Sequence, residues 1–173
     1  IKKNISQKIK VIFFEDKKGQ YENGKFIPWV NNKLLFEILT YLKTKTNLQV
    51  TICKHPSKVI SDFVKFNFPY TNLKDPTYEV VYNSDIIIGT IGSSMLDGFI
   101  FQKKVISLSY CHYFTSLLDI FENDNVVTDF NNFKLKLKSI ILELKENKNS
   151  TYKKYYNNII CNSDNIEKNY SKL

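Results

Sequence analysis

The chain has 173 residues, 43% of them hydrophobic and 14% aromatic, which suits one folded domain with a sizeable core and excludes a disordered chain. No run of about 18 apolar residues occurs, so the sequence predicts no membrane-spanning helix. The net charge is +8, yet all 25 basic residues are lysine. The absence of arginine disfavours specific nucleic-acid recognition, because arginine is the usual bidentate reader of phosphates and bases.

The lysine excess has two interpretations. It predicts either a solvated surface or attraction toward anionic lipid headgroups or a charged saccharide. Three cysteines, Cys53, Cys111 and Cys161, lie far apart without a C-x-x-C pair, which is typical of a reducing cytoplasm. The neighbouring pairs Cys53 with His55 and Cys111 with His112 match no zinc spacing, so we expect no metal site.

The first half of the chain predicts two buried strands and a helix between them. Residues 10–14 form a short apolar run typical of a buried strand, and 15–28 contain turn residues typical of a loop. A helix capped by Asn31 or Asn32 is expected to about Lys43. A second strand is expected over 48–53, followed by a short helix over 57–66 and a weak strand over 66–70.

The second half continues the alternation of helices and strands. Pro76 is expected in the first turn of a helix that runs through Tyr82. Further strands are expected from Asp85, over 104–109 and over 125–128, and further helices over 93–98, 114–121, about 131–144 and 151–160, with a last short helix after them. This alternation predicts an α/β fold: a single Rossmann-like, doubly wound parallel sheet with helices on both faces.

A serine pair opens the helix that follows the strand at residues 85–89. Ser93 and Ser94 follow the turn at Gly92, and Gly89 is expected to supply a second turn conformation. Helix N-termini carry unpaired N–H groups and favour anions, so this turn is a candidate phosphate site. An N-cap serine that satisfies only its own helix is the alternative. The pattern is neither a P-loop nor G-x-G-x-x-G, which disfavours triphosphate hydrolysis and dinucleotide binding.

A second group of residues that could bind phosphate follows the strand over 48–53. Pro56 fixes the chain direction after His55, whose imidazole can donate a hydrogen bond to a phosphate, and Lys54 adds positive charge beside it. A turn histidine without a ligand is the alternative. Ligands of doubly wound sheets bind outside the carboxyl ends of the strands, and both candidate groups follow strands directly. We therefore expect them on one edge of the sheet.

Other polar and aromatic residues carry weaker expectations. Asp97, one turn into the serine-led helix, is either a favourable first-turn acid or a carboxylate for ribose hydroxyls. Glu15 and Asp16 are expected to be solvated loop acids rather than bases. The aromatic residues Trp29, Phe26 and Tyr21 are expected to cover the core rather than to stack on a sugar.

The order of Lys54-His55-Pro56, Ser84–Gly89, Ser93–Gly98 and Lys104–Ile106 resembles the C-terminal domain of GT-B glycosyltransferases. The similarity is to the bacterial capsule polysaccharide group, which includes polysialyltransferase-like and teichoic-acid glycerophosphotransferase-like enzymes. It implies that His55, Ser93 and Ser94 hold the phosphate of a nucleotide-activated donor. Asp97 stands where that group has a longer glutamate, which puts its ribose contact in doubt.

The resemblance also implies what else the protein needs. A CMP-, CDP- or UDP-linked donor would be the substrate, no cofactor would be required, and the acceptor would be a saccharide or lipid-linked molecule. GT-B enzymes have a second, N-terminal domain, and this chain begins with Ile rather than Met. We therefore expect residues 1–173 to be the donor-binding part of a two-domain protein, inactive alone, cytoplasmic, with contact at the inner face of the plasma membrane as a further expectation.

Two other functions remain open at this point. A UDP-sugar 2-epimerase-like domain would share the architecture and also need a second domain. A non-catalytic interaction domain would instead use the lysine surface to contact a membrane or a partner.

Overall fold

The computed structural model of the chain describes residues 8–15, 19–28, 30–55, 63–71, 77–90, 93–108 and 126–146. Its centre is a five-stranded sheet in the order β4-β1-β5-β6-β7, in which every pairing is parallel. The strands are β1 (Ile9–Glu15), β4 (Leu48–Lys54), β5 (Ile86–Thr90), β6 (Lys104–Leu108) and β7 (Val126–Val127). This arrangement confirms the expected α/β, Rossmann-like sheet.

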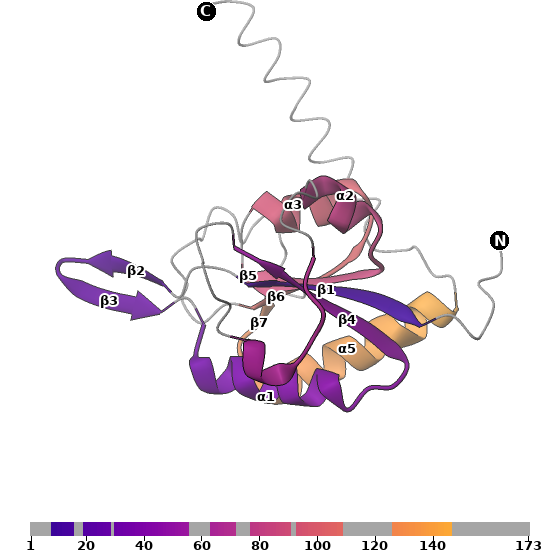
Figure 1. Ribbon diagram of the computed structural model, residues 1–173, viewed down its shortest axis with the longest axis horizontal. Helices are drawn as coiled ribbons and strands as arrows, with labels where there is room; N and C mark the ends of the chain where they lie inside the picture. Colours follow the sequence, from indigo (N-terminus) through magenta and orange to yellow (C-terminus); the bar gives the residue numbers. More distant parts are fainter. Residues whose placement is uncertain are drawn as a thin grey trace, which may run out of the picture.

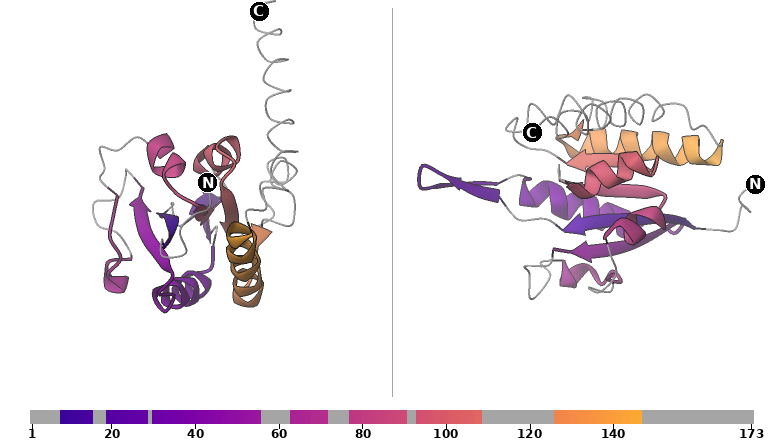
Figure 2. Two further views of the ribbon diagram at one scale, coloured as in Figure 1. Left: turned by 90° about the vertical axis from the view of Figure 1, so that its right-hand side faces the viewer. Right: turned by 90° about the horizontal axis from the view of Figure 1, so that it is seen from above.

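Helices cover both faces of the sheet (Figures 1 and 2). Helices α1 (Asn32–Lys43) and α5 (Phe130–Lys145) lie on one face, and α2 (Thr77–Tyr82) and α3 (Ser93–Ile100) lie on the other. Because successive side chains of a strand point to opposite faces, the apolar run of β1 serves two cores. Phe13 packs in the core beneath α1 and α5, and Phe14 packs in the core with Met95 of α3.

Polar caps start the two long helices. The Asn31 side-chain oxygen accepts a hydrogen bond from the Lys33 backbone N–H at 2.8 Å, which confirms the expected start of α1. Helix α5 starts at Phe130, one residue before the predicted start near 131, and its N-cap is Asp129. The Asp129 carboxylate accepts from the Asn132 backbone N–H at 2.9 Å. A carboxylate at this position also favours the positive end of the helix dipole.

The described part of the expected loop over 15–28 is not a loop, and residues 16–18 lie outside the described residues. Strands β2 (Gly19–Glu22) and β3 (Lys25–Pro28) form an antiparallel hairpin that projects from the carboxyl edge of the sheet (Figure 1). Asn23 and Gly24 both have positive φ, 49° and 76°. A two-residue hairpin turn needs this conformation at both central residues, and Asn-Gly supplies it at least cost. The Asn-Gly pair therefore marked a hairpin rather than a loop.

The segment after β4 differs in detail from the expected helix and strand. Residues 56–62 lie outside the described residues, and the described end of the expected helix is a 3₁₀ turn, η1 (Val64–Phe66). The expected strand over 66–70 is reduced to a single parallel bridge between Tyr70 and Ile52. Predicted helices at 114–121 and 151–160, and the last short helix, also lie outside the described residues. Of the helices in the described ranges, none is long and apolar enough to cross a membrane.

Specific polar contacts hold the amino edge of the sheet. The Asp85 carboxylate accepts from the Lys10 backbone N–H at 2.9 Å, and the Asp85 backbone N–H donates to the Lys10 carbonyl at 2.9 Å. At the start of β6, the Lys104 Nζ atom lies 2.7 Å from the Glu143 Oε2 atom of α5. The Lys104 side chain is only 4% exposed, so this ion pair ties α5 to the sheet from within.

Candidate functional site

The order of the strands places a topological switch point at the carboxyl edge of the sheet. After β1 the chain adds β4 on one side of it, and then returns to add β5 on the other side. The connections that leave β1 and β5 consequently diverge toward opposite faces. Ligands of open parallel sheets bind at such a switch point, beyond the carboxyl ends of the strands. Residues close to the ends of β1 and β5 are therefore the best placed to contact a ligand.

His55 lies directly at this edge. Lys54 is the last residue of β4, His55 follows it, and both side chains are partly buried. Lys54 is the register partner of Glu15, the last residue of β1. Parallel register partners lie on the same face of a sheet, so a cationic side chain and a carboxylate end neighbouring strands together. Pro56 lies outside the described residues.

The serine-led helix also starts at this edge. Helix α3 begins at Ser93, just after β5 ends at Thr90, which confirms the expected strand and helix. Residues 91 and 92, where the turn is expected, lie outside the described residues. The backbone N–H groups of the first turn of α3 have no partner within the helix, so they can bind an anion. Gly92 lies outside the described residues, and for Ser93 and Ser94 the structure describes the backbone only.

The two candidate groups share an edge but do not end neighbouring strands. Strand β1 lies between β4 and β5, and neighbouring strands are spaced about 4.8 Å apart, which puts the two strand ends about 10 Å from each other. This is a distance between backbones, so a ligand that lies across the end of β1 can be reached by side chains from both strand ends.

Asp97 lies one turn into α3, on the helix that covers the second face of the sheet. Burial raises the pKa of its carboxyl above the ordinary value of 3.8. Desolvation disfavours the charged form of a carboxyl and strengthens any hydrogen bond that the carboxylate accepts. Asp97 is thus a partly buried carboxylate one helical turn from the candidate anion site. In this position it can accept a hydrogen bond from a ligand hydroxyl.

Gly89 does not supply the turn that the sequence suggested. It lies inside β5, and a Cβ atom at this position would come within 2.6 Å of Met95 Cε and 3.0 Å of Phe14 Cβ. The glycine is therefore a packing requirement, because it allows the first turns of α3 to approach the sheet closely.

Glu15 and Ser107 are two buried polar residues near this edge that the sequence did not reveal as such. Glu15 is not a solvated loop acid: it ends β1 at the switch point and is 2% exposed. Asp16 lies outside the described residues. Ser107 of β6 is the register partner of Gly89, it is fully buried, and its Oγ atom has no hydrogen-bond partner in the described part of the chain. Glu15 and Ser107 each follow apolar residues of a predicted strand directly, and this position could have predicted their burial.

Cys53 precedes Lys54 in β4 and offers no reactive thiolate. Burial raises the pKa of its thiol above the ordinary value of 9.0, and a hydrogen bond with Thr71 only partly counters this. A protonated thiol is a poor metal ligand and a poor nucleophile. Among the described residues, no group of three His, Cys, Asp or Glu side chains could hold a metal ion.

Comparison with known proteins gives a fold likeness alone. No protein-family model and no curated protein matches the chain. Among solved structures, the wall teichoic acid polymerase TagF superposes with a TM-score of 0.52 at 12% identity, covering 90% of this chain and 40% of TagF. A TagF variant soaked with CDPG gives 0.52 at 12% identity, covering 90% and 38%. A second variant gives 0.53 at 10% identity, covering 88% and 39%.

These matches support a GT-B-like fold for this chain. The chain spans about two fifths of the length of the TagF chains that it resembles.

Proposed function

We propose that this chain is the donor-binding domain of a transferase that moves a sugar or polyol phosphate from a nucleotide-activated donor to a capsule or surface polysaccharide. The observation that carries the proposal is the carboxyl edge, where Lys54 ends β4, His55 follows it, and α3 begins beyond β5. The likeness to TagF supports the reaction class, because that protein is named as a wall teichoic acid polymerase.

The proposed roles follow from charge and position. The bond between the transferred group and the donor's phosphate oxygen breaks, and the acceptor hydroxyl bonds to the transferred group. The nucleotide leaves with its phosphate negatively charged. We assign stabilisation of this charge to His55, Lys54 and the first turn of α3 with Ser93 and Ser94, since fixed donors at the leaving oxygen lower the barrier most effectively.

Pro56 and Gly92 shape the two turns in this proposal, and Asp97 accepts a hydrogen bond from a ribose hydroxyl. The separation of about 10 Å between the ends of β4 and β5 suits a donor that lies across the end of β1. The Lys54 ammonium group, the His55 N–H donor and a helix N-terminus already supply groups that bind an anion, so we propose that no metal or other cofactor is needed. The acceptor hydroxyl's proton goes to a base on an N-terminal acceptor domain, which this proposal requires.

Nucleotide binding to the full chain tests the proposal. Titration calorimetry with CMP, CDP and UDP should detect binding at millimolar or lower concentration. CDPG is a fourth probe, because one TagF structure was soaked with it. His55→Ala should weaken binding of the best nucleotide about 10- to 100-fold, since a hydrogen bond to a charged group contributes roughly 1.5–3 kcal/mol. His55→Gln, which keeps an N–H donor, should recover part of the loss.

A matched pair of lysine variants serves as the control. Lys54→Gln removes one positive charge at the carboxyl edge, and Lys43→Gln removes one from the exposed end of α1 at the amino edge. Lys54→Gln alone should weaken binding. Absence of binding by all four nucleotides, or equal affinity in wild type and His55→Ala, would overturn the proposal. Preference for UDP over the cytidine nucleotides, together with exchange of the sugar's C2 proton in the full-length protein, would instead favour the 2-epimerase-like alternative.

A further inference from the structure

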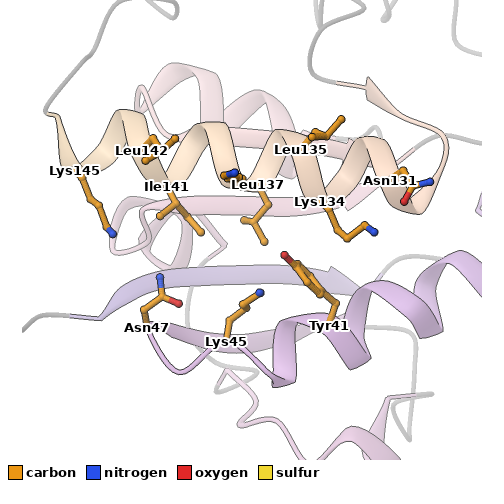
Figure 3. A pocket seen from close by; sticks show the side chains of 11 residues that line it. Tyr41, Lys45, Asn47, Asn131, Lys134, Leu135, Leu137, Ile141, Leu142 and Lys145 are labelled. Atoms are coloured by element: carbon orange, nitrogen blue, oxygen red, sulfur yellow. The ribbon is translucent and has the colours of Figure 1, made fainter.

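A groove of about 670 Å³ lies between α1 and α5, away from the carboxyl edge (Figure 3). Its apolar floor comes from α5, where Leu137 and Ile141 point toward α1. Its charged lining consists of Lys45, Lys134, Lys138 and Lys145. The proposed donor site uses none of these residues.

The groove has positive charge without any balancing acid. No aspartate or glutamate is among its lining residues. The one acid within α5, Glu143, pairs with Lys104 at 2.7 Å. The Lys45 ammonium group lies 4.1 Å from the centre of the Tyr41 ring, so it is held over the groove rather than directed away from it. This face of the molecule therefore contributes a concentrated share of the net charge of +8.

Large apolar side chains accompany the lysines on the same helix. Leu135 is 68% exposed and Leu142 is 49% exposed, and Figure 3 shows both on the side of α5 that faces away from α1. The exposed surface of α5 consequently alternates leucine and lysine. A helix that combines apolar and basic side chains on its accessible surface is typical of binding in the interfacial region of a membrane.

We infer that the α1–α5 groove and the exposed surface of α5 form a docking site for a bilayer that contains anionic phospholipids. Lysine ammonium groups contact the phosphate headgroups, and Leu135 and Leu142 enter the boundary between headgroups and acyl chains. Charge complementarity selects an anionic surface, and the exposed leucines select a lipid one.

Two features favour a lipid surface over an anionic saccharide. A saccharide site commonly offers an open aromatic face, but here the Lys45 ammonium group covers the Tyr41 ring. The charges are all lysine, which acts as a point charge, whereas the bidentate fork of arginine gives geometric selection of single phosphates. Binding to a diffuse layer of anionic headgroups requires no such geometry, because each lysine adds electrostatic attraction near the surface.

Vesicle flotation with the full chain tests this inference. The protein should float with vesicles of phosphatidylcholine and phosphatidylglycerol, and not with phosphatidylcholine alone. Lys138→Gln with Lys145→Gln should weaken binding about 25-fold, since each lysine near an anionic surface contributes about a fivefold factor. Leu135→Gln with Leu142→Gln should remove the part of the binding that survives high salt, because salt screens only the electrostatic part.

The matched control is Lys25→Gln with Lys103→Gln, which changes the net charge equally on the hairpin and on the side of α3. This variant should bind as wild type does. Equal loss in the control variant, or equal flotation with neutral vesicles, would overturn the inference. Binding of soluble dextran sulfate without binding to anionic vesicles would also overturn the inference. Circular dichroism checks that each variant folds. His55→Ala should float normally, so this test and the nucleotide test fail independently.

Discussion

The two edges of the parallel sheet are built differently. At the amino edge, polar side chains stabilise the fold itself. The Asp85 carboxylate accepts a hydrogen bond from the Lys10 backbone N–H, and Lys104 forms an ion pair with Glu143. At the carboxyl edge, Lys54 ends β4 and His55 follows it, and α3 presents its N-terminus beyond β5. One edge thus holds the layers together, while the other concentrates groups suited to an anion. Variants at the two edges should accordingly separate stability from binding.

The largest expected effect lies at the amino edge. Glu143→Ala leaves the Lys104 ammonium group buried without its carboxylate, at 4% exposure. Removing one partner of a buried pair is strongly destabilising, and we expect a loss of about 3 kcal/mol in the free energy of unfolding, since Glu143 itself is partly exposed. Urea unfolding measures the loss. Glu37→Ala, a partly exposed acid on α1, is the control and should cost much less.

The same pair makes stability depend on pH. Burial of Glu143 opposes its ionisation, but the hydrogen bond and the charge of Lys104 outweigh it, so the pKa of this carboxyl lies below its ordinary value of 4.5. A depressed folded pKa contributes stability above the unfolded value, and that contribution is lost as pH falls through the folded value. Wild type should lose stability more steeply than Glu143→Gln below about pH 4.5. Parallel curves would contradict this account.

An intermediate effect is expected where α3 contacts the sheet, because this helix serves both stability and the candidate site. A Cβ atom on Gly98 would come within 2.7 Å of Ile87 Cδ1 and 2.8 Å of Val105 Cγ2. Gly98→Val should therefore overpack this contact and cost about 1–3 kcal/mol. If α3 presents the anion site, nucleotide affinity should fall as well. Unchanged stability in a thermal melt would show that the helix shifts without strain.

The smallest effect on stability is expected for Asp97→Asn. Burial raises the pKa of Asp97, so the folded state binds its proton more tightly and loses stability as pH rises from the unfolded value toward the folded one. Replacement by asparagine removes that loss, and neutral-pH stability should be equal or slightly higher. Nucleotide affinity should nevertheless decrease if Asp97 accepts a ribose hydroxyl. A decrease in both quantities would indicate a structural role only.

The sequence predicted the sheet well, because each central strand is an apolar run with a distinct end. The sequence also predicted that His55 and Ser93 lie on the same edge of the sheet, because each follows an apolar run that forms a parallel strand. Periodicity carries no information about which strands become neighbours, so the insertion of β1 between β4 and β5 could not be foreseen. The spacing of the two candidate groups therefore had to come from the structure.

Local misjudgements had local causes. Gly89 was assigned to a turn because glycine is common in turns, whereas close packing of Phe14 and Met95 requires it inside β5. Glu15 was assigned to a loop because it is charged, although it directly continues an apolar strand and is 2% exposed. The hairpin over 19–28 was missed because its short strands lack a clear alternation of apolar and polar residues.

The bridge between Tyr70 and Ile52 has a consequence for solubility. Strand β4 forms an outer edge of the sheet, and an exposed edge invites pairing with a strand of another molecule. The Ile52 backbone N–H donates to Pro69 O at 2.9 Å, and Ile52 O accepts from the Thr71 N–H at 2.9 Å. The segment at residues 69–71 thus occupies the hydrogen-bonding groups at the middle of β4, and it protects the chain against edge-to-edge aggregation.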